Sequence, residues 1–269
     1  MKDTHLLTLI VAAVIGIAAT APAGETTRSS LPGQLQSIIS AANAVACGSQ
    51  SNSALQIAAK NGDAEAQLKL GRMYRDGTDG LEKDLAKACE WWLKAALQGN
   101  AAAQGQLGRA YMRGLGVSAD STEAVKWFRE GARNGDPWAQ LFLGDAYEFG
   151  HGPLKKDQQL AVTWWTKSMM KGIPRAQMLV GRAYALGEGV NQNLAESIRL
   201  TTLAAKGGDP HAQCALGVAY RDGAGGNSIV DPVEAYRWFA LSAGTEGETS
   251  VRNLATQARD ELAKKLSDG

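Results

Sequence analysis

Residues 101–136 read AAAQGQLGRAYMRGLGVSADSTEAVKWFREGARNGD, and most of the chain repeats this stretch with variations. A Leu-Gly or Val-Gly pair followed by Tyr three residues later occurs five times, at steps of 37, 36, 37 and 36 residues. The glycines of these pairs are Gly71, Gly108, Gly144, Gly181 and Gly217. An Ala-Gln dipeptide precedes each pair, and its glutamines are Gln67, Gln104, Gln140, Gln177 and Gln213. A repeat of this period is typical of solenoids built from stacked supersecondary units.

Each unit has the apolar spacing of two short helices. Leu107, Gly108 and Tyr111 lie at helical spacing, and Ala124 and Phe128 do so again after a glycine-rich break. We expect the first helix to follow a side-chain cap at Asp63, Asn100, Asp136 or Asp209. It should end at a left-handed glycine, namely Gly77, Gly114, Gly150, Gly187 or Gly223. The second helix should begin at Asp84, Asp120, Asp157, Asn193 or Asp231, with capping boxes completed by Glu123, Glu196 and Glu234.

One such helix pair cannot bury its apolar face alone, so neighbouring pairs must stack. The unit resembles the Sel-like repeat (SLR) family, a branch of the tetratricopeptide-type α-solenoids, through A-x-A-Q-x-x-L-G-x-x-Y, a G-x-G-V turn, and A-x-x-W-[FW]-x-x-A. The resemblance implies an all-α, right-handed α/α solenoid of about five helix-turn-helix repeats with capping helices at both ends. The predicted repeats are residues 62–100, 101–136, 137–173, 174–209 and 210–248.

The first 23 residues have the pattern of an export signal. Lys2 precedes an apolar run over residues 6–19, and small residues at 21–23 favour cleavage after Ala23. We therefore expect a periplasmic or secreted chain without a stable membrane anchor; an uncleaved anchor or a core helix is the alternative.

Two segments flank the predicted repeats. Residues 24–61 are expected to form a polar tether and a degenerate capping hairpin, with helices over 34–47 and 53–61. Residues 249–269 are expected to form a C-terminal capping helix that covers the last apolar edge. Its apolar face would contain Val251, Leu254, Ala258, Leu262 and Leu266.

Composition and spacing argue against several kinds of chemistry. The 28 basic and 27 acidic residues nearly balance, so no global charge indicates nucleic acid as a partner. His151 and His211 lie two repeats apart, with no Cys or carboxylate cluster at metal-ligand spacing, so we expect no metal and no cofactor. Of three cysteines at least one lacks an internal partner; Cys47 and Cys89 could form a bridge, and a buried free thiol is the alternative.

One short motif keeps an enzyme hypothesis open. Ser168 and Lys171 match the S-x-x-K pattern of serine acylases, without the companion S-D-N and K-T-G elements. The corresponding alternative function is a periplasmic serine hydrolase or a β-lactam-binding enzyme.

The predicted binding site lies on the first helix of each repeat. In tetratricopeptide-like stacks, the face corresponding to Ala102, Gly105, Arg109 and Met112 lines a concave groove that holds partner segments. Carried through the repeats, these positions also include Leu68, Leu141 and Cys214, and the acids Glu65, Asp145 and Glu148. The predicted partner-binding residues are Arg72, Arg75, Arg109, Met112, Trp138, Arg175, Met178, Arg182 and Arg221. Arginine, aromatic residues and Met are typical of protein-recognition surfaces.

These observations predict a non-enzymatic, exported solenoid that binds another protein. The resemblance suggests a scaffold, a regulator, or an immunity protein that neutralises a secreted toxin. The partner would offer an acidic segment or a protein edge, and the chain alone would be a monomer. Two alternatives stay open. Some of these arginines could pair with acids of the next repeat and only tie the stack together, and the groove could bind peptidoglycan instead.

Overall fold

The computed structural model describes residues 54–223, 230–244 and 249–267, which belong to one compact unit, residues 52–269. Within these ranges the secondary structure is helical, without strands, and the prediction of an all-α solenoid is confirmed. The predicted export signal, the tether and the first capping helix lie outside the described residues. No helix within the described ranges is long and apolar enough to span a membrane.

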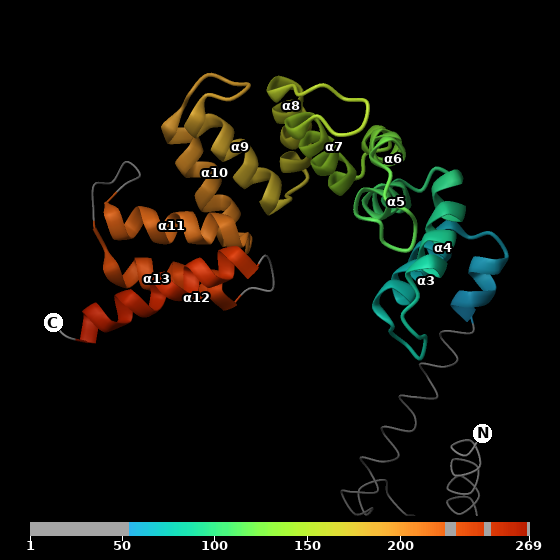
Figure 1. Cartoon of the computed structure of the whole chain (residues 1–269), viewed down its shortest axis with the longest axis horizontal. Coiled ribbons are helices and arrows are strands. Elements are labelled where there is room, and N and C mark those ends of the chain that lie inside the picture. Colours follow the sequence, from blue (N-terminus) through green and yellow to red (C-terminus); the bar gives the residue numbers. More distant parts are fainter. Residues whose placement is uncertain (1–53, 224–229, 245–248, 268–269) are drawn as a thin grey trace, which may run out of the picture. The chain divides into compact units, whose positions relative to one another are not determined.

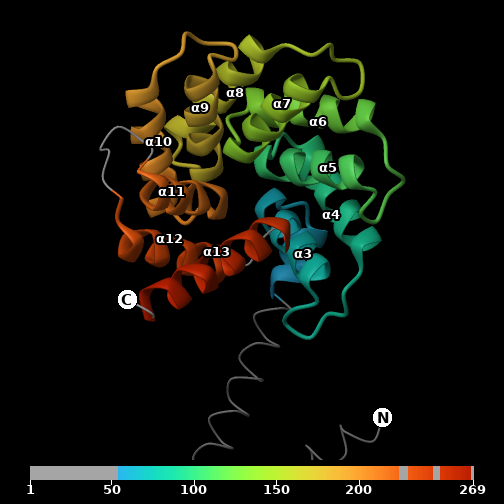
Figure 2. The ribbon, with the colours of Figure 1, turned by 60° about the vertical axis from the view of Figure 1, so that its left-hand side comes forward.

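Each repeat consists of a first helix, A, and a second helix, B, both 13 residues long. The A helices are α3 (Ala64–Asp76), α5 (Ala101–Arg113), α7 (Pro137–Phe149), α9 (Pro174–Leu186) and α11 (Pro210–Asp222). The B helices are α4 (Leu85–Leu97), α6 (Ser121–Arg133), α8 (Gln158–Met170), α10 (Leu194–Lys206) and α12 (Pro232–Gly244). Every helix packs against the next one in chain order, as Figures 1 and 2 show, so the core continues from repeat to repeat.

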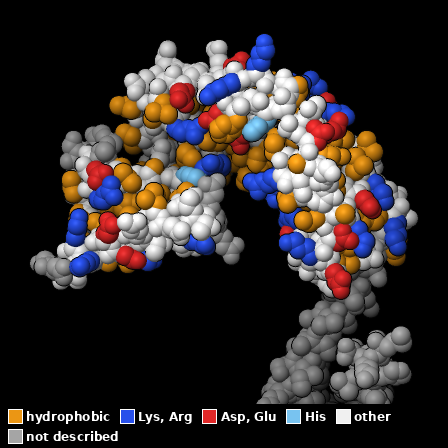
Figure 3. All heavy atoms as spheres, in the orientation of Figure 1, with side chains coloured by type: hydrophobic (Ala, Val, Ile, Leu, Met, Phe, Trp, Pro, Cys, Tyr) orange, Lys and Arg blue, Asp and Glu red, His pale blue; other side chains and the backbone are white. Residues whose placement is uncertain are grey.

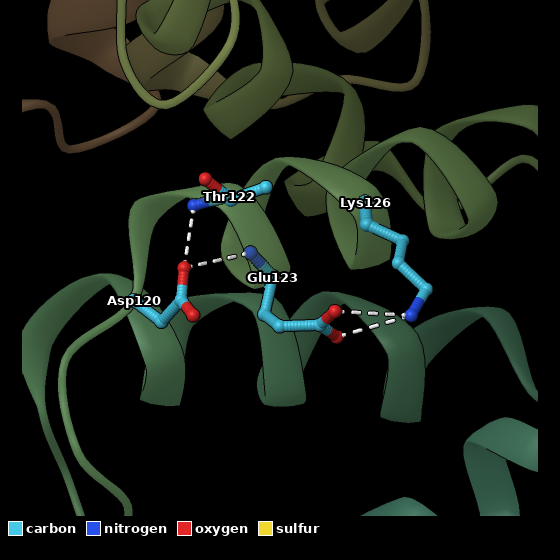
Figure 4. Close-up of polar contacts among 4 residues, drawn as sticks. All are labelled: Asp120, Thr122, Glu123 and Lys126. Atoms are coloured by element: carbon cyan, nitrogen blue, oxygen red, sulfur yellow. Dashed lines mark hydrogen bonds and ion pairs between the residues drawn. The ribbon is translucent and has the colours of Figure 1, made fainter.

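Side-chain caps and left-handed glycines set the helix boundaries. The predicted caps of both helices accept backbone N–H bonds, and each A helix ends at its predicted glycine with positive φ. In the fourth repeat Ile173 stands at the cap of α9 and forms no side-chain bond there. At the start of α6, Asp120 accepts hydrogen bonds from the N–H groups of Thr122 and Glu123, as Figure 4 shows.

A capping box needs two hydrogen bonds, and the predicted bond from the Glu side chain back to the N-cap N–H is wrong. Glu123 does not return to the N–H of Asp120 but pairs with Lys126 (Figure 4). The Asp120 N–H instead donates to the carbonyl of Tyr111 in helix A, at 2.9 Å. The N-cap residues of the other B helices make the equivalent bond to Tyr74, Tyr147, Tyr184 and Tyr220. The tyrosine carbonyl at the end of helix A therefore fixes the start of helix B.

Each Leu-Gly or Val-Gly pair lets helix B approach helix A closely. A Cβ on Gly71 would lie 2.4 Å from Trp92, and one on Gly144 would lie 2.4 Å from Trp165. Phe128 and Phe239 make the same contact in the second and fifth repeats. The buried aromatic residue is thus the second of the two consecutive positions W-[FW] in the helix B motif. In the fourth repeat Leu200 fills the core instead.

The Ala-Gln dipeptide joins one repeat to the next. The buried Gln104 side chain donates to the Ala96 carbonyl in helix B of the preceding repeat, at 3.1 Å. Gln140 makes the equivalent bond to Ala132 at 3.2 Å. Gln67 and Gln213 follow the same pattern. These bonds satisfy carbonyls at the end of helix B and fix the register between repeats.

The last helix, α13 (Thr249–Ser267), packs against α12 and α11, as a capping helix should. Its buried residues are Ala255, Ala258 and Leu262. The predicted apolar face was therefore wrong for Leu254 and Leu266, which are 57% and 44% exposed. At the other end, residues 54–60 form a helical turn segment that packs against α3.

Candidate functional site

The nine predicted binding residues all lie on A helices, and together they are called the A-helix face below. They are Arg72 and Arg75 on α3, Arg109 and Met112 on α5, Trp138 on α7, Arg175, Met178 and Arg182 on α9, and Arg221 on α11. Arg72 and Arg221 are exposed, Trp138 is 46% exposed, and the other six are partly buried. Leu68, Leu141 and Cys214, expected on the same face, are instead buried in the core because the helices pack there.

Three of the six arginines are held by acids of this chain. Arg75 forms two hydrogen bonds to Asp76, at 2.7 and 2.6 Å. Arg221 does the same with Asp222. Arg182 of α9 pairs with the buried Glu148 of α7, so this ion pair ties two repeats together. The alternative interpretation of the arginines is therefore confirmed for Arg182.

A charge-balanced cluster lies between α7 and α9 and contains Asp145, Glu148, Trp165 and Arg182. The Trp165 indole Nε1–H donates to Asp145 Oδ1 at 2.9 Å, and the Arg182 guanidinium lies 5.8 Å from the Trp165 ring centroid. Burial raises the pKa of Asp145 to about 6, although the Trp165 bond and the nearby Arg175 favour its charged form. Both acids of this cluster are thus committed to partners within the chain.

The equivalent positions between α3 and α5 hold a basic cluster, which consists of Arg72, Arg75, Trp92 and Arg109. Arg72 occupies the register position of Asp145, Arg75 that of Glu148, and Arg109 that of Arg182. Trp92 corresponds to Trp165, and each of these indoles faces the glycine of its Leu-Gly pair. Arginines stand where the other cluster has acids, so the cluster concentrates positive charge.

The basic cluster leaves two groups without partners. Within the described ranges, neither a hydrogen bond nor an ion pair is formed by Arg109, and the buried Trp92 Nε1 likewise has no hydrogen-bond acceptor. Burial lowers the pKa of the Arg109 guanidinium, and the charges of Arg113 and Arg75 lower it further. In Figure 3, Lys and Arg side chains gather on the concave side of the region where Figure 1 labels α3 and α5.

Trp138 provides the exposed aromatic group of the A-helix face. Its ring centroid lies 6.2 Å from that of Phe142, which in turn lies 5.3 Å from that of Phe128. This row of rings holds one side of the indole while the other stays accessible. Met112 packs near the same rings, and Met178 packs between two core clusters. Both methionines are therefore only partly available to a partner.

Ser168, the nucleophile of the enzyme hypothesis, is not accessible. Ser168 is fully buried, and its hydroxyl donates to the Pro137 carbonyl of α7, the A helix of the same repeat, at 2.8 Å. Ser242 makes the equivalent bond to Pro210. Lys171 is exposed at the end of α8. Ser168 is thus a small residue at a helix contact, and it is out of reach of any substrate.

The described cysteines lie in the core. Among the described residues, Cys89 and Cys214 are buried thiols that form no disulfide, and Cys89 Sγ donates to the Leu115 carbonyl at 3.1 Å. Burial raises the pKa of Cys89 to about 11, so this thiol stays protonated near neutral pH. Cys47 lies outside the described residues. No group of three potential metal ligands occurs in the portion of the chain that the structure describes.

Sequence reasoning missed Trp92, the member of the basic cluster that carries its unsatisfied donor. A comparison of the residue after each Leu-Gly or Val-Gly pair with the aromatic residue of helix B would have identified it. An acid follows the pair in the third repeat, where the aromatic residue is Trp165. Arg72 follows it in the first, where the aromatic residue is again a tryptophan.

The fold and the repeated contacts define the class of this protein as an α-solenoid built from helix pairs. The chain belongs to the Sel1 repeat family, whose model matches residues 64–100, 101–136, 139–172, 174–209 and 210–243. The predicted Sel-like repeat resemblance is therefore confirmed.

Solved structures of several repeat proteins are similar to this chain. A Sel1 repeat protein from Oxalobacter formigenes is 28% identical, with a TM-score of 0.63 and coverage of 80% of this chain and 99% of that one. A protective antigen with an SLR fold from uropathogenic Escherichia coli strains is 30% identical, with a TM-score of 0.61 and coverage of 78% of this chain and 48% of that one. This chain thus spans about half of the antigen.

One curated protein is similar over a shorter stretch. The ERAD-associated E3 ubiquitin-protein ligase component HRD3A of Arabidopsis thaliana is 40% identical over 62 residues, which are 23% of this chain and 9% of that protein. The match spans less than two of the repeats described above.

Proposed function

We propose that this protein is an exported, non-enzymatic solenoid that binds another protein through the A-helix face. The observation that carries the proposal is the exposed Trp138, which contacts a row of tilted aromatic rings and lies on the same face as the arginines. Tryptophan and arginine dominate the binding energy of protein interfaces, and a preoriented ring loses little freedom on binding.

Membership of the Sel1 repeat family supports a protein as the partner, because these repeats present extended surfaces. The signal-like pattern of residues 1–23 supports a place in the cell envelope or outside the cell. A dedicated regulator, an immunity protein and a scaffold differ in their number of partners: the first two would form one stoichiometric complex, and a scaffold would form several weaker ones.

A pull-down from native envelope extract tests the proposal. The mature chain, residues 24–269, is used as bait at low and then high salt, and captured proteins are identified by mass. Trp138→Ala and Arg72→Glu should lose the partner while the fold is kept, because both side chains are exposed. Tyr236→Ala, which alters an exposed aromatic residue on helix B of the fifth repeat, should keep it.

Capture that is equal in all variants would contradict a role for the A-helix face. Capture of nothing by the unmodified chain would contradict the proposal itself. The variant Arg182→Glu is unsuitable for this test, because it would place a third acid beside Glu148 and Asp145 and disturb the stack. Cell fractionation with a tag at the C-terminus tests the export separately.

A further inference from the structure

We propose that the basic cluster of α3 and α5 is a carboxylate-binding site, which receives an Asp or Glu side chain of the protein partner. The proposal rests on the proposed function and adds to it the chemical group that is recognised and the place where it binds. The chain itself supplies the template, because the charge-balanced cluster of α7 and α9 shows how acids occupy the same positions.

The two clusters have the same geometry around their tryptophans. A Cβ on Gly71 would lie 2.4 Å from Trp92 Nε1, and a Cβ on Gly144 would lie 2.5 Å from Trp165 Nε1. Both indoles are therefore oriented alike against helix A. Trp165 Nε1 donates to the carboxylate of Asp145, which directly follows Gly144. The first repeat has an arginine, Arg72, at the position of that acceptor.

The unsatisfied donor belongs to a buried side chain that borders a small depression. Trp92 is 3% exposed, and its Nε1 has no partner among the described residues. A buried donor left in this state costs free energy that an acceptor recovers. Arg75, Trp92, Gln106 and Arg109, among others, line a depression of about 10 Å³. A water molecule fits in a cavity of about this volume, and so does one oxygen atom of a carboxylate.

The charges select an anion for this position. Arg109 is half-buried, and burial lowers the pKa of its guanidinium; the charges of Arg113 and Arg75 lower this pKa further, while Asp76 raises it. Asp76 compensates Arg75 but is itself exposed at the end of α3. An incoming carboxylate would give Arg109 the partner that Glu148 gives Arg182. Charge-assisted bonds of this kind are stronger than neutral ones.

Indole N–H resonances in a ¹⁵N-labelled full chain provide the direct test. The probe is an acetylated and amidated peptide of alternating Gly and Glu, and the matched control peptide has Gln in place of Glu. Trp92→Phe assigns the Trp92 resonance, and it should keep the fold because Phe128 and Phe239 occupy the equivalent position. We expect the Trp92 resonance to move with the Glu peptide and not with the Gln peptide.

Two arginine variants sharpen the test. Arg109→Gln should weaken binding of the Glu peptide by about tenfold. Arg199→Gln makes the same change on helix B of the fourth repeat, outside the A-helix face, and should change the binding by less than about twofold. A Trp92 resonance that does not move overturns the proposal, and so does equal binding by both variants.

The outcome is separable from that of the proposed function. A partner captured equally well by the unmodified chain and by Arg109→Gln would contradict the carboxylate site and leave protein binding intact. If no partner is captured, the proposed function fails, and the peptide titration still decides whether the basic cluster binds a carboxylate.

Discussion

The basic cluster of the first two repeats and the charge-balanced cluster of the third and fourth occupy equivalent places in one repeated fold. Both have a buried tryptophan against a glycine of helix A, and both have an arginine on the next A helix. Of the four residues in each cluster, two differ. They are Asp145 and Glu148 on α7 in one cluster and Arg72 and Arg75 on α3 in the other.

This difference separates packing from recognition. The glycine, the aromatic residue and the buried glutamine recur because they fix how helices approach. The residues that change between repeats are those that packing does not determine, and they decide whether the indole N–H has an acceptor, as in Trp165, or none among the described residues, as in Trp92. Matched substitutions in the two clusters should therefore have different effects.

The largest difference should appear as a function of pH. The pKa of Asp145 is raised from 3.8 in the unfolded chain to about 6 in the fold, so the native state binds the extra proton. The stability that this group contributes is therefore greatest below pH 4 and falls by about 3 kcal/mol as the pH rises to 6. Asp145→Asn, which keeps an acceptor for Trp165, should remove this dependence in urea unfolding between about pH 4 and 7.

The matched control is Arg72→Asn at the equivalent position. Position 72 itself holds no carboxyl group, so this variant should keep the pH dependence that comes from Asp145. It changes only the contribution of Asp136, whose pKa is raised by burial and lowered in part by Arg72. A pH dependence in the Asp145→Asn variant that parallels that of the unmodified chain would mean that Asp145 titrates normally in the folded protein.

The arginines of the two clusters should differ in their contribution to stability. Arg182→Ala leaves the buried Glu148 without its partner and should lower the free energy of unfolding by about 2 kcal/mol, since the pair is partly exposed. Arg109→Ala removes a half-buried charge that has like charges beside it, so stability should stay equal or rise slightly. Urea midpoints measure both, and a larger loss for Arg109→Ala would reverse the assignment of the two clusters.

The fold was predictable because each recurring residue has one local reason. Gly114 and Gly150 end helices by adopting positive φ, and Asp120 and Asp157 cap the helices that follow. Such reasons act within a few residues and are visible in the sequence. The predicted capping box at Glu123 failed because a tertiary bond to the Tyr111 carbonyl took the N–H that it needed.

The candidate site was less predictable, because side-chain pairing between repeats depends on rotamers and distances. Helical spacing placed Arg109 and Arg182 on A helices, and the structure has them there. Spacing could not show that Arg182 is held by Glu148 while Arg109 has no acid within bonding distance among the described residues. It also placed Leu141 on the binding face, where packing of the next helix buries it.

The indoles of the two clusters should respond differently to loss of their N–H groups. Trp165→Phe keeps an aromatic ring and removes the donor to Asp145, so it should destabilise the fold by about 1 kcal/mol more than Trp92→Phe does. Trp92→Phe removes a donor that has no acceptor in the described part of the chain, and the loss should be limited to packing. Thermal unfolding of both variants at neutral pH checks this; equal losses would indicate that Trp92 has an acceptor in solution.

The smallest effect comes from rebuilding one cluster as the other. Arg72→Asp places a carboxylate where Asp145 stands in the third repeat, within reach of Trp92 Nε1 if the two clusters are equivalent. The gain from the new bond is partly offset by exposure of position 72 and by loss of the Arg72 charge that acts on the Asp136 carboxylate. We therefore expect a stabilisation of only a few tenths of a kcal/mol. The indole N–H resonance of Trp92 should move toward that of Trp165, and the Gly-Glu peptide should no longer shift it. Arg72→Asn is the neutral control. A less stable Arg72→Asp variant with an unchanged Trp92 resonance would show that the two tryptophans are not equivalent. The carboxylate at position 72 would then form no hydrogen bond with the Trp92 indole N–H.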